Sequence, residues 1–302
     1  MLMTSLLILT FMKPAVQDVP VYFVKFKQER TLFASDEPVI LMIRLGNQVE
    51  KQLKSKFFPD ILAGLSVETI DGKKLEMSKN FSSAAFYSRL KTLGYGAHKD
   101  FRLNLRRYYP DMQPGNVYKV TYSDANYDLT AKNISIVNHE MPDLDSEFVV
   151  DTALGKFTIQ LDSDQAPNHS RNFALLTKME FYRDMIWHRV VPGYVIQTGD
   201  PVGNGTGGSG YELELEKSPF LKHKKYMVGM ARGNETDSAT SQFYICLERQ
   251  KDLDDGYTIF AEVTSGFEVI DAIGKVPTSG RSGRPPEKPL EDVALHSITI
   301  KE

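Results

Sequence analysis

Short runs of alternating apolar and polar residues dominate the first half of the chain. They lie at residues 21–26, 39–45, 65–70, 117–122 and 129–137. Each run predicts a β-strand, because successive side chains of a strand point to opposite faces. The third run is followed by Asp71-Gly72, a dipeptide typical of hairpin turns. Many short strands without a long amphipathic helix favour an immunoglobulin-like β-sandwich over residues 19–138.

The second half mixes strands with two helical patterns. Strands are expected at 148–152 and 156–161, and a helix is expected to begin at Pro167, with Phe173, Leu176 and Met179 on one apolar face. A second helix is expected over 267–273, ended by Gly274 in the left-handed conformation common after helices. Many strands with two helices predict a closed antiparallel β-barrel capped by the helices.

The acidic, proline-containing stretch 139–146 separates the two patterns and is expected to be a linker. The sequence therefore predicts a β-sandwich domain at 19–138 and a barrel domain at 147–302. A length of 302 residues is enough for two such domains.

Charge and cysteine content exclude some classes of function. There are 36 Lys and Arg against 39 Asp and Glu, a net charge of -3, so no nucleic-acid partner is expected. The single cysteine, Cys246, cannot form an intrachain disulfide, and its apolar strand setting predicts a packed thiol rather than a reactive one.

The chain begins with an apolar segment, Met1 to Met12, too short to span a bilayer comfortably. Residues 1–18 are expected to be a signal or membrane-anchor segment, which implies an extracytoplasmic location: periplasm, envelope or secreted. No Lys or Arg precedes the apolar run. A buried N-terminal segment and a cytoplasmic location therefore stay open as the alternative.

Five ordered motifs in the second half carry the functional information. They are Trp187-His188-Arg189-Val190-Val191-Pro192-Gly193-Tyr194-Val195-Ile196-Gln197, the glycine loop 205–211, Gly229-Met230-Ala231-Arg232, Ser241-Gln242-Phe243-Tyr244-Ile245, and Leu253-Asp254-Asp255-Gly256-Tyr257. Together they resemble the cyclophilin-type peptidyl-prolyl cis/trans isomerases, and the run 232–240 is closest to bacterial members. The resemblance covers 147–302 and none of 1–146.

The chemistry of such an enzyme needs a fixed cation. Rotation about an X-Pro bond meets a barrier of roughly 18–20 kcal/mol, because the nitrogen shares its lone pair with the carbonyl. In the twisted state the nitrogen regains that lone pair, and a donated hydrogen bond stabilises it. The resemblance assigns this role to Arg189 and assigns binding of the substrate carbonyl to Gln197, further along the same strand region. It implies no cofactor and no metal.

The remaining site residues also follow from the resemblance. The pocket for the proline ring is expected from Tyr194, Val195, Tyr244 and Leu253, with Phe243 supporting it from behind and Tyr257 at its rim. The main chain at Ala231 and Arg232 is expected to align the peptide, beside Gln242 of the pocket-wall strand. The insert 278–289, rich in Gly, Pro and Arg, is expected to be a mobile loop.

The expected partners are X-Pro segments of unfolded or flexible proteins, with the enzyme acting as a folding helper. The N-terminal domain is expected to recruit clients, anchor the enzyme or mediate dimerisation. Asp252 stands where drug-sensitive relatives carry tryptophan, so weak cyclosporin binding is expected. The alternative function is a scaffold or chaperone module that binds Pro-containing peptides without turnover.

Overall fold

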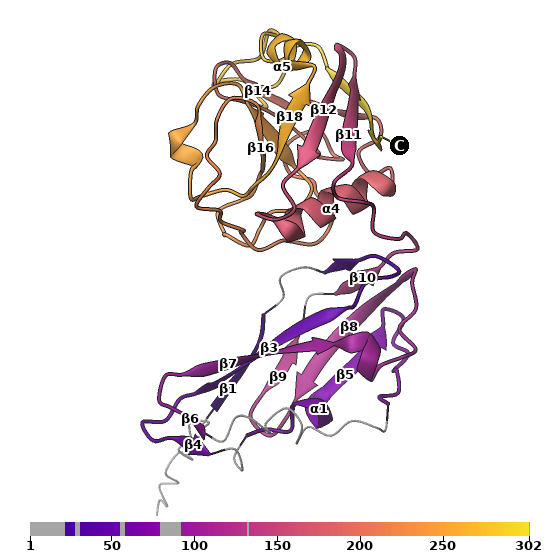
Figure 1. The fold of residues 1–302 in the computed structure, drawn as a ribbon, viewed down its shortest axis with the longest axis vertical. Helices are drawn as coiled ribbons and strands as arrows, with labels where there is room; N and C mark the ends of the chain where they lie inside the picture. Colours follow the sequence, from indigo (N-terminus) through magenta and orange to yellow (C-terminus); the bar gives the residue numbers. More distant parts are fainter. Residues whose placement is uncertain (1–21, 28–30, 55–57, 79–91, 132, 302) are drawn as a thin grey trace, which may run out of the picture.

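The computed structural model describes residues 22–27, 31–54, 58–78, 92–131 and 133–301. Figure 1 shows two bodies joined by one connection, the first formed by the N-terminal strands and the second by residues 147–301. The expected signal or anchor segment lies outside the described residues. Among the described helices, none combines the length and the apolar character needed to cross a membrane.

The N-terminal body is built almost entirely of strands. They are β1 (Tyr22–Lys27), β2 (Leu32–Phe33), β3 (Ile40–Asn47), β4 (Leu53–Lys54), β5 (Leu65–Thr69), β6 (Thr92–Leu93), β7 (His98–Asn104), β8 (Asn116–Ser123), β9 (Asp128–Thr130) and β10 (Ile134–Ile136). Two single-turn helices, α1 (Ile61–Gly64) and α3 (Leu105–Tyr108), lie between them. All five predicted strand regions contain a strand, although the run 129–137 is split into β9 and β10.

These strands form three described sheets. One has the order β1-β3-β7, a second has the order β2-β10-β8-β5 with β9 beside β8, and β4 pairs with β6. The turn predicted at Asp71-Gly72 is present, with Gly72 at φ 89° and its N–H donated to the Thr69 carbonyl. Side chains from both larger sheets share one buried cluster that includes Leu41, Val67 and Val120. The immunoglobulin-like topology itself is not confirmed.

The C-terminal body combines strands with the longer helices. Its strands are β11 (Glu147–Thr152), β12 (Gly155–Leu161), β13 (Met185–Ile186), β14 (Arg189–Val191), β15 (Val195–Thr198), β16 (Met227–Met230), β17 (Phe243–Cys246), β18 (Ile259–Ser265) and β19 (Ala294–Ile300). The helices are α4 (Pro167–Lys178), α5 (Phe267–Ile273) and the 3₁₀ turn η2 (Lys251–Leu253). Both predicted α-helices are therefore confirmed.

One curled sheet with the order β13-β19-β11-β12-β18-β16-β17-β15-β14 carries this body. The closed barrel is not confirmed, because β13 and β14 end the sheet without pairing with each other. β13 and β14 are consecutive in the chain, and between them Trp187 donates its N–H to the Val293 carbonyl.

The two helices differ from their prediction in detail. Phe173 and Leu176 of α4 are buried, but Met179 caps the helix and is 38% exposed, so the apolar stripe ends one turn early. Gly274 after α5 keeps a right-handed φ of -64°, contrary to the prediction. Its glycine is needed for space instead, since a Cβ there would lie 2.8 Å from the Leu247 methyl carbons.

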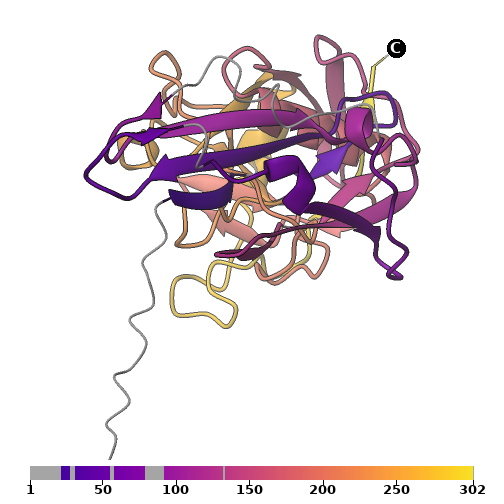
Figure 2. The same cartoon turned by 90° about the horizontal axis from the view of Figure 1, so that it is seen from below.

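The connection between the bodies is docked rather than free. Ser35 donates its N–H to the His139 carbonyl, and the Met141 N–H reaches the Asp36 carboxylate at 3.1 Å. Leu32 and Ala34 are buried in the core cluster of the C-terminal body. Figure 1 shows the N-terminal strands beside the end of this body that carries α4, and Figure 2, seen from below, shows these strands in front of the C-terminal body. There Arg171 of α4 forms an ion pair with the buried Glu37.

Candidate functional site

A tight hairpin brings the two expected catalytic side chains together. β14 and β15 are antiparallel, with Arg189 directly opposite Gln197. Pro192 and Gly193 make the turn, with Gly193 at φ 71° and the Tyr194 N–H donated to the Val191 carbonyl. Proline followed by a left-handed glycine is the requirement of a type II turn. Gln197, expected further along the same strand region, thus lies on the strand next to that of Arg189.

The Arg189 guanidinium is held on two sides. Its Nη1 donates to Gln197 Oε1 at 3.3 Å, while Nε and Nη2 both lie 2.9 Å from Oε2 of Glu287. The Arg189 side chain remains 36% exposed, whereas that of Glu287 is 13% exposed. Arg189 therefore lies at the surface of the site with its orientation already constrained.

Gln197 connects this arginine to the glycine loop through a second glutamine. Gln197 Nε2 donates to Gln242 Oε1 at 2.9 Å, and Gln242 Nε2 donates to the carbonyls of Gly205 and Gly207 at 3.1 and 2.7 Å. The loop in turn closes on Asp200, whose carboxylate accepts the Gly205 N–H. Burial opposes ionisation of Asp200, but hydrogen bonds from loop N–H groups outweigh it and lower its pKa.

A small apolar cluster, here called the outer cluster, lies apart from the main core. Its buried members are Val195, Tyr244, Cys246 and Leu253, with Val191, Tyr194, Ala231 and Tyr257 half-buried against them. Six residues expected to bind the proline ring or align the peptide are thus brought together, from β15, β17, η2 and the segments next to β15, β16 and η2.

Alternation along β17 explains why Phe243 is not in the outer cluster. Phe243 and Ile245 point into the main core, where the Phe243 ring meets that of Phe173 edge-on at 5.5 Å. Tyr244 and Cys246 point to the other face. Gly229 lies opposite Tyr244, and a Cβ there would be 2.4 Å from the tyrosine ring. Phe243 therefore supports the cluster from behind, and Gly229 makes room for Tyr244.

Tyr244 ends on a histidine that the sequence did not single out. Its hydroxyl lies 2.9 Å from His223 Nε2, and His223 Nδ1 lies 3.1 Å from Asp254 Oδ1. Arg249 forms an ion pair with the same aspartate. Burial lowers the pKa of His223, against the opposing effect of Asp254. A neutral imidazole then donates to Asp254 and accepts from Tyr244, which fixes the tyrosine ring.

The remaining expected residues form the edge of the outer cluster. Tyr194 donates its hydroxyl to Asp252 at 2.7 Å, and burial together with that carboxylate raises the pKa of the phenol. The Arg232 guanidinium lies 4.6 Å from the centre of the Tyr257 ring and donates to the Gly256 carbonyl. The Ala231 N–H donates to the Gln242 carbonyl.

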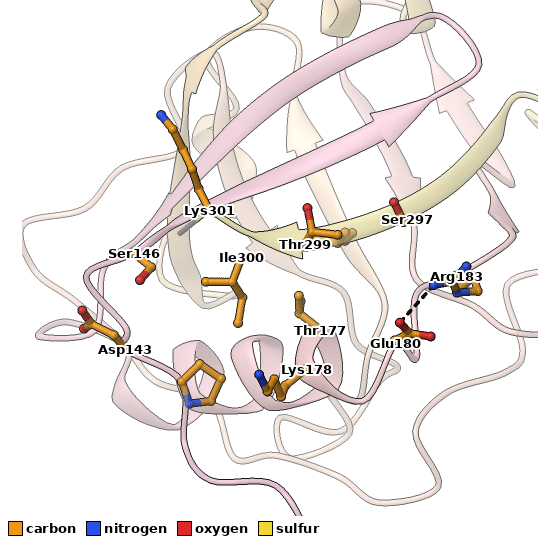
Figure 3. Close-up of a pocket in the computed structure, with 12 residues that line it drawn as sticks. Asp143, Ser146, Thr177, Lys178, Glu180, Arg183, Ser297, Thr299, Ile300 and Lys301 are labelled. Atoms are coloured by element: carbon orange, nitrogen blue, oxygen red, sulfur yellow. Dashed lines mark ion pairs between the residues drawn. The ribbon is translucent and has the colours of Figure 1, made fainter.

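A separate groove of about 480 Å³ lies away from these residues. Figure 3 shows it between the end of α4 and β19, with Ser146 of the connection, Thr177 and Ile300 pointing toward it. None of the expected site residues lines it. We assign it no role.

Sequence reasoning missed Glu287 and His223. Glu287 lies in the insert that was expected to be a mobile loop, yet this insert is hydrogen-bonded to β14 through Val190. The sequence signal for His223 is its position shortly before β16, and many buried histidines lie near a strand without lining a site.

Comparison with known proteins places this half of the chain. The family model described as cyclophilin type peptidyl-prolyl cis-trans isomerase/CLD matches residues 147–300. Peptidyl-prolyl cis-trans isomerase-like 1 of Aspergillus fumigatus is 37% identical over 160 residues, which cover 52% of this chain and 96% of that protein. Peptidyl-prolyl cis-trans isomerase-like 3 of Homo sapiens is 36% identical over 152 residues, 49% of this chain and 92% of that protein.

Among solved structures, a cyclophilin-type isomerase of Cryptosporidium parvum, determined in the presence of the dipeptide Ala-Pro, is similar to this chain. It is 27% identical, with a TM-score of 0.48, and the match covers 52% of this chain and 99% of that one.

Proposed function

Because the chain belongs to the cyclophilin-type peptidyl-prolyl cis-trans isomerase family, we propose that it catalyses rotation about X-Pro peptide bonds in unfolded or flexible proteins. The proline ring would lie on the outer cluster, with Tyr244 and Leu253 beneath it. The peptide would run past the main chain at Ala231 and Arg232.

In the proposed mechanism Arg189 does the electrostatic work. As the X-Pro bond twists, its nitrogen becomes pyramidal and regains a lone pair that can accept a hydrogen bond. The guanidinium, which is always charged, would donate to it, while Gln197 would bind the neighbouring carbonyl. Rotation needs no acid, base or nucleophile, and no cofactor enters this scheme.

One observation supports the proposal most. The outer cluster is an apolar group separate from the main core, with half-buried members at its edge, and β15 runs from Val195 in that cluster to Gln197, the partner of Arg189. A fixed cation beside an apolar surface is what a twisting X-Pro bond requires, since the ring must be gripped while the bond rotates.

The test is an NMR exchange assay of a short X-Pro peptide with the full chain. The wild type should accelerate exchange, and Arg189→Ala should lower kcat/KM by about 100-fold or more, because it removes a donor used mainly in the transition state. Arg183→Ala is the matched control, since Arg183 is exposed and forms an ion pair with Glu180 of its own turn. Equal turnover by wild type and Arg189→Ala would overturn the Arg189 mechanism, and an inactive, folded wild type would overturn the isomerase proposal.

The scaffold alternative is favoured by one observation, namely that Arg189 is already paired with Glu287. A protein that only binds Pro-containing segments would bind the peptide with unchanged affinity after Arg189→Ala and would not accelerate exchange in either form. Exchange acceleration by the wild type therefore distinguishes the two functions, with a peptide titration of both proteins as the check that each still binds.

For the N-terminal half we propose a role in recruiting clients, anchoring or dimerisation, because no catalytic group is assigned there. An extracytoplasmic location is proposed from the apolar segment Met1 to Met12. Cell fractionation of the full chain and of a variant lacking residues 1–18 tests it. Identical soluble cytoplasmic fractions would contradict the proposal.

Two architectural proposals remain from the sequence. The barrel would close through residues 185–191, supported by the hydroxyl of Thr198 on β15, which donates to the Ile186 carbonyl on β13 at 2.8 Å. The immunoglobulin-like sandwich is supported by the buried cluster shared between the sheets. An experimental structure of the full chain tests both.

A further inference from the structure

We propose that Glu287 is a positioning residue for isomerisation, holding the Arg189 guanidinium in the orientation from which it donates to the twisting X-Pro bond. The inference rests on the proposed isomerase function and adds to it a residue outside the recognised motifs. It starts from the contact already described, in which Nε and Nη2 of Arg189 both lie 2.9 Å from Glu287 Oε2.

The position of Glu287 is set by the strand that carries Arg189. The Glu287 carbonyl accepts the N–H of Val190, the residue next to Arg189, at 2.8 Å. Its own N–H is donated to the Gly280 carbonyl at 2.9 Å, and its φ is 59°. The N–H and the carbonyl of Glu287 are thus both hydrogen-bonded, and this fixed main chain places the carboxylate beside the guanidinium.

The rest of the insert keeps this arrangement closed. Ser279 donates its N–H to the Lys288 carbonyl, and its hydroxyl accepts the Lys288 N–H at 3.1 Å. The Leu290 N–H reaches the Pro277 carbonyl. These cross-links tie the two arms of the insert together beside β14.

The remaining donors of Arg189 leave room for a substrate. A guanidinium has five N–H groups. The Nε hydrogen and one Nη1 hydrogen are donated to Glu287 and Gln197, which leaves three, and the side chain is 36% exposed. Glu287 therefore constrains Arg189 without covering it, which favours positioning over inhibition.

The energetic argument has two opposing parts. An arginine side chain has many rotamers, and a partner that fixes one of them before substrate arrives lowers the entropy lost in the transition state. The carboxylate also offsets part of the positive charge. Its side chain is 13% exposed and the second cation, Arg281, is 3.9 Å away but 91% exposed, so Arg189 is its main partner.

The experiment compares kcat and KM of the full chain with Glu287→Ala, Glu287→Gln, Arg189→Lys and the double variant Arg189→Lys with Glu287→Ala. Glu287→Ala should lower kcat about 10-fold with KM changed less than about twofold, since orientation matters most in the transition state. Glu287→Gln, which keeps one acceptor oxygen, should recover part of the loss. In the Arg189→Lys background, Glu287→Ala should have little further effect.

Glu291→Ala is the matched control, because Glu291 is an exposed carboxylate just beyond the insert. A second readout does not depend on turnover: the NMR signal of the Arg189 Nε–H. In wild type its hydrogen should exchange slowly with solvent, and Glu287→Ala should accelerate that exchange at least about 10-fold, whereas Glu291→Ala should not.

Outcomes separate this inference from the proposed function. An active wild type whose Glu287→Ala variant turns over equally fast, or faster, overturns the positioning role and leaves the isomerase proposal intact. A second pair of results overturns it too: additive effects of Arg189→Lys and Glu287→Ala on kcat, and an Arg189 Nε–H exchange rate that Glu287→Ala leaves unchanged. An inactive, folded wild type overturns both proposals together, because no variant can then lose activity.

Discussion

Hydrogen bonds link tyrosine hydroxyls to aspartates in both halves of the molecule, but these contacts have different roles in the two halves. In the N-terminal half Asp124 accepts the hydroxyls of Tyr22 and Tyr122, and it also accepts the N–H groups of Asn126 and Tyr127 at 2.7 and 2.8 Å. The two N–H contacts close the turn between β8 and β9, and the Tyr22 hydroxyl joins β1 to that turn. The carboxylate there is a staple of the fold.

In the C-terminal half the same residue types act along the outer cluster. The Tyr244 hydroxyl reaches Asp254 through His223, and Tyr194 reaches Asp252 directly. Here the hydroxyls hold aromatic rings in place beside Arg189. The difference teaches that a tyrosine-aspartate pair does not indicate a site by itself, because its role depends on whether the ring lines a turn or a pocket.

The largest effect is expected from removing the staple. Asp124→Ala should destabilise the N-terminal half by about 2 kcal/mol, because two hydroxyls and two N–H groups lose their acceptor. Trp187, the only tryptophan, is buried in the C-terminal half. Denaturation followed by circular dichroism should shift, whereas Trp187 fluorescence and peptide turnover should not. Asp128→Ala, an exposed carboxylate of β9, is the control.

A second prediction changes the edge of the pocket. Asp252→Trp removes the acceptor of Tyr194 and adds an indole, and it should strengthen cyclosporin binding about 10-fold, or 1.4 kcal/mol. Isothermal titration of wild type and variant measures this. Asp255→Trp, at a carboxylate three residues further along whose side chain is 74% exposed, should leave affinity unchanged. Strong binding by the wild type would contradict the expectation.

A smaller effect is expected at the base of the pocket. Tyr244→Phe keeps the ring but leaves His223 Nε2 without its donor, so the C-terminal half should lose about 1 kcal/mol of stability. Turnover should change less than about twofold, since the apolar surface remains. Trp187 fluorescence during urea unfolding gives the stability. Tyr95→Phe, at a side chain that is 65% exposed, controls for loss of a phenol.

The smallest effect is a dependence on pH. Burial lowers the pKa of His223 below the ordinary 6.5, so the unfolded state takes up a proton first as the pH falls through that value. Stability of the C-terminal half is therefore fully present above pH 6.5 and declines below it. Urea unfolding at pH 7.5 and 5.5 should show this decline, and His223→Gln should reduce it. The pKa of His188, also lowered by burial, accounts for the part that remains.

The sequence predicted the strand positions and the membership of the outer cluster more successfully than their connections. Alternation locates β5 and β8 because one face of each is buried, and the motif order locates Tyr194, Val195, Tyr244 and Leu253. It could not place Gln197 opposite Arg189, since that depends on where the hairpin turns. Nor could it find Glu287, because a glycine- and proline-rich insert gives no periodic signal and its contact spans 98 residues.

The closed barrel and the immunoglobulin-like sandwich remain unconfirmed for a similar physical reason. Period-2 alternation indicates which face of a strand is buried, but sheet topology depends on which strands pair. In the C-terminal half the order of the sheet depends on the break in strand structure at Trp187-His188, because it separates β13 from β14, the two end strands. Neither residue is a glycine or a proline, so the sequence carries no turn signal at the break.

Cys246 lies in the floor of the outer cluster, fully buried, with burial raising the pKa of its thiol to about 12. At neutral pH only about one molecule in 10⁵ then carries the thiolate, which is the form that peroxide and alkylating reagents attack. The protein should therefore keep its pocket under oxidising conditions and should not cross-link to a second copy through sulfur. With its only cysteine unreactive, the chain accepts a single engineered surface cysteine as a clean attachment point for a fluorescent or spin probe.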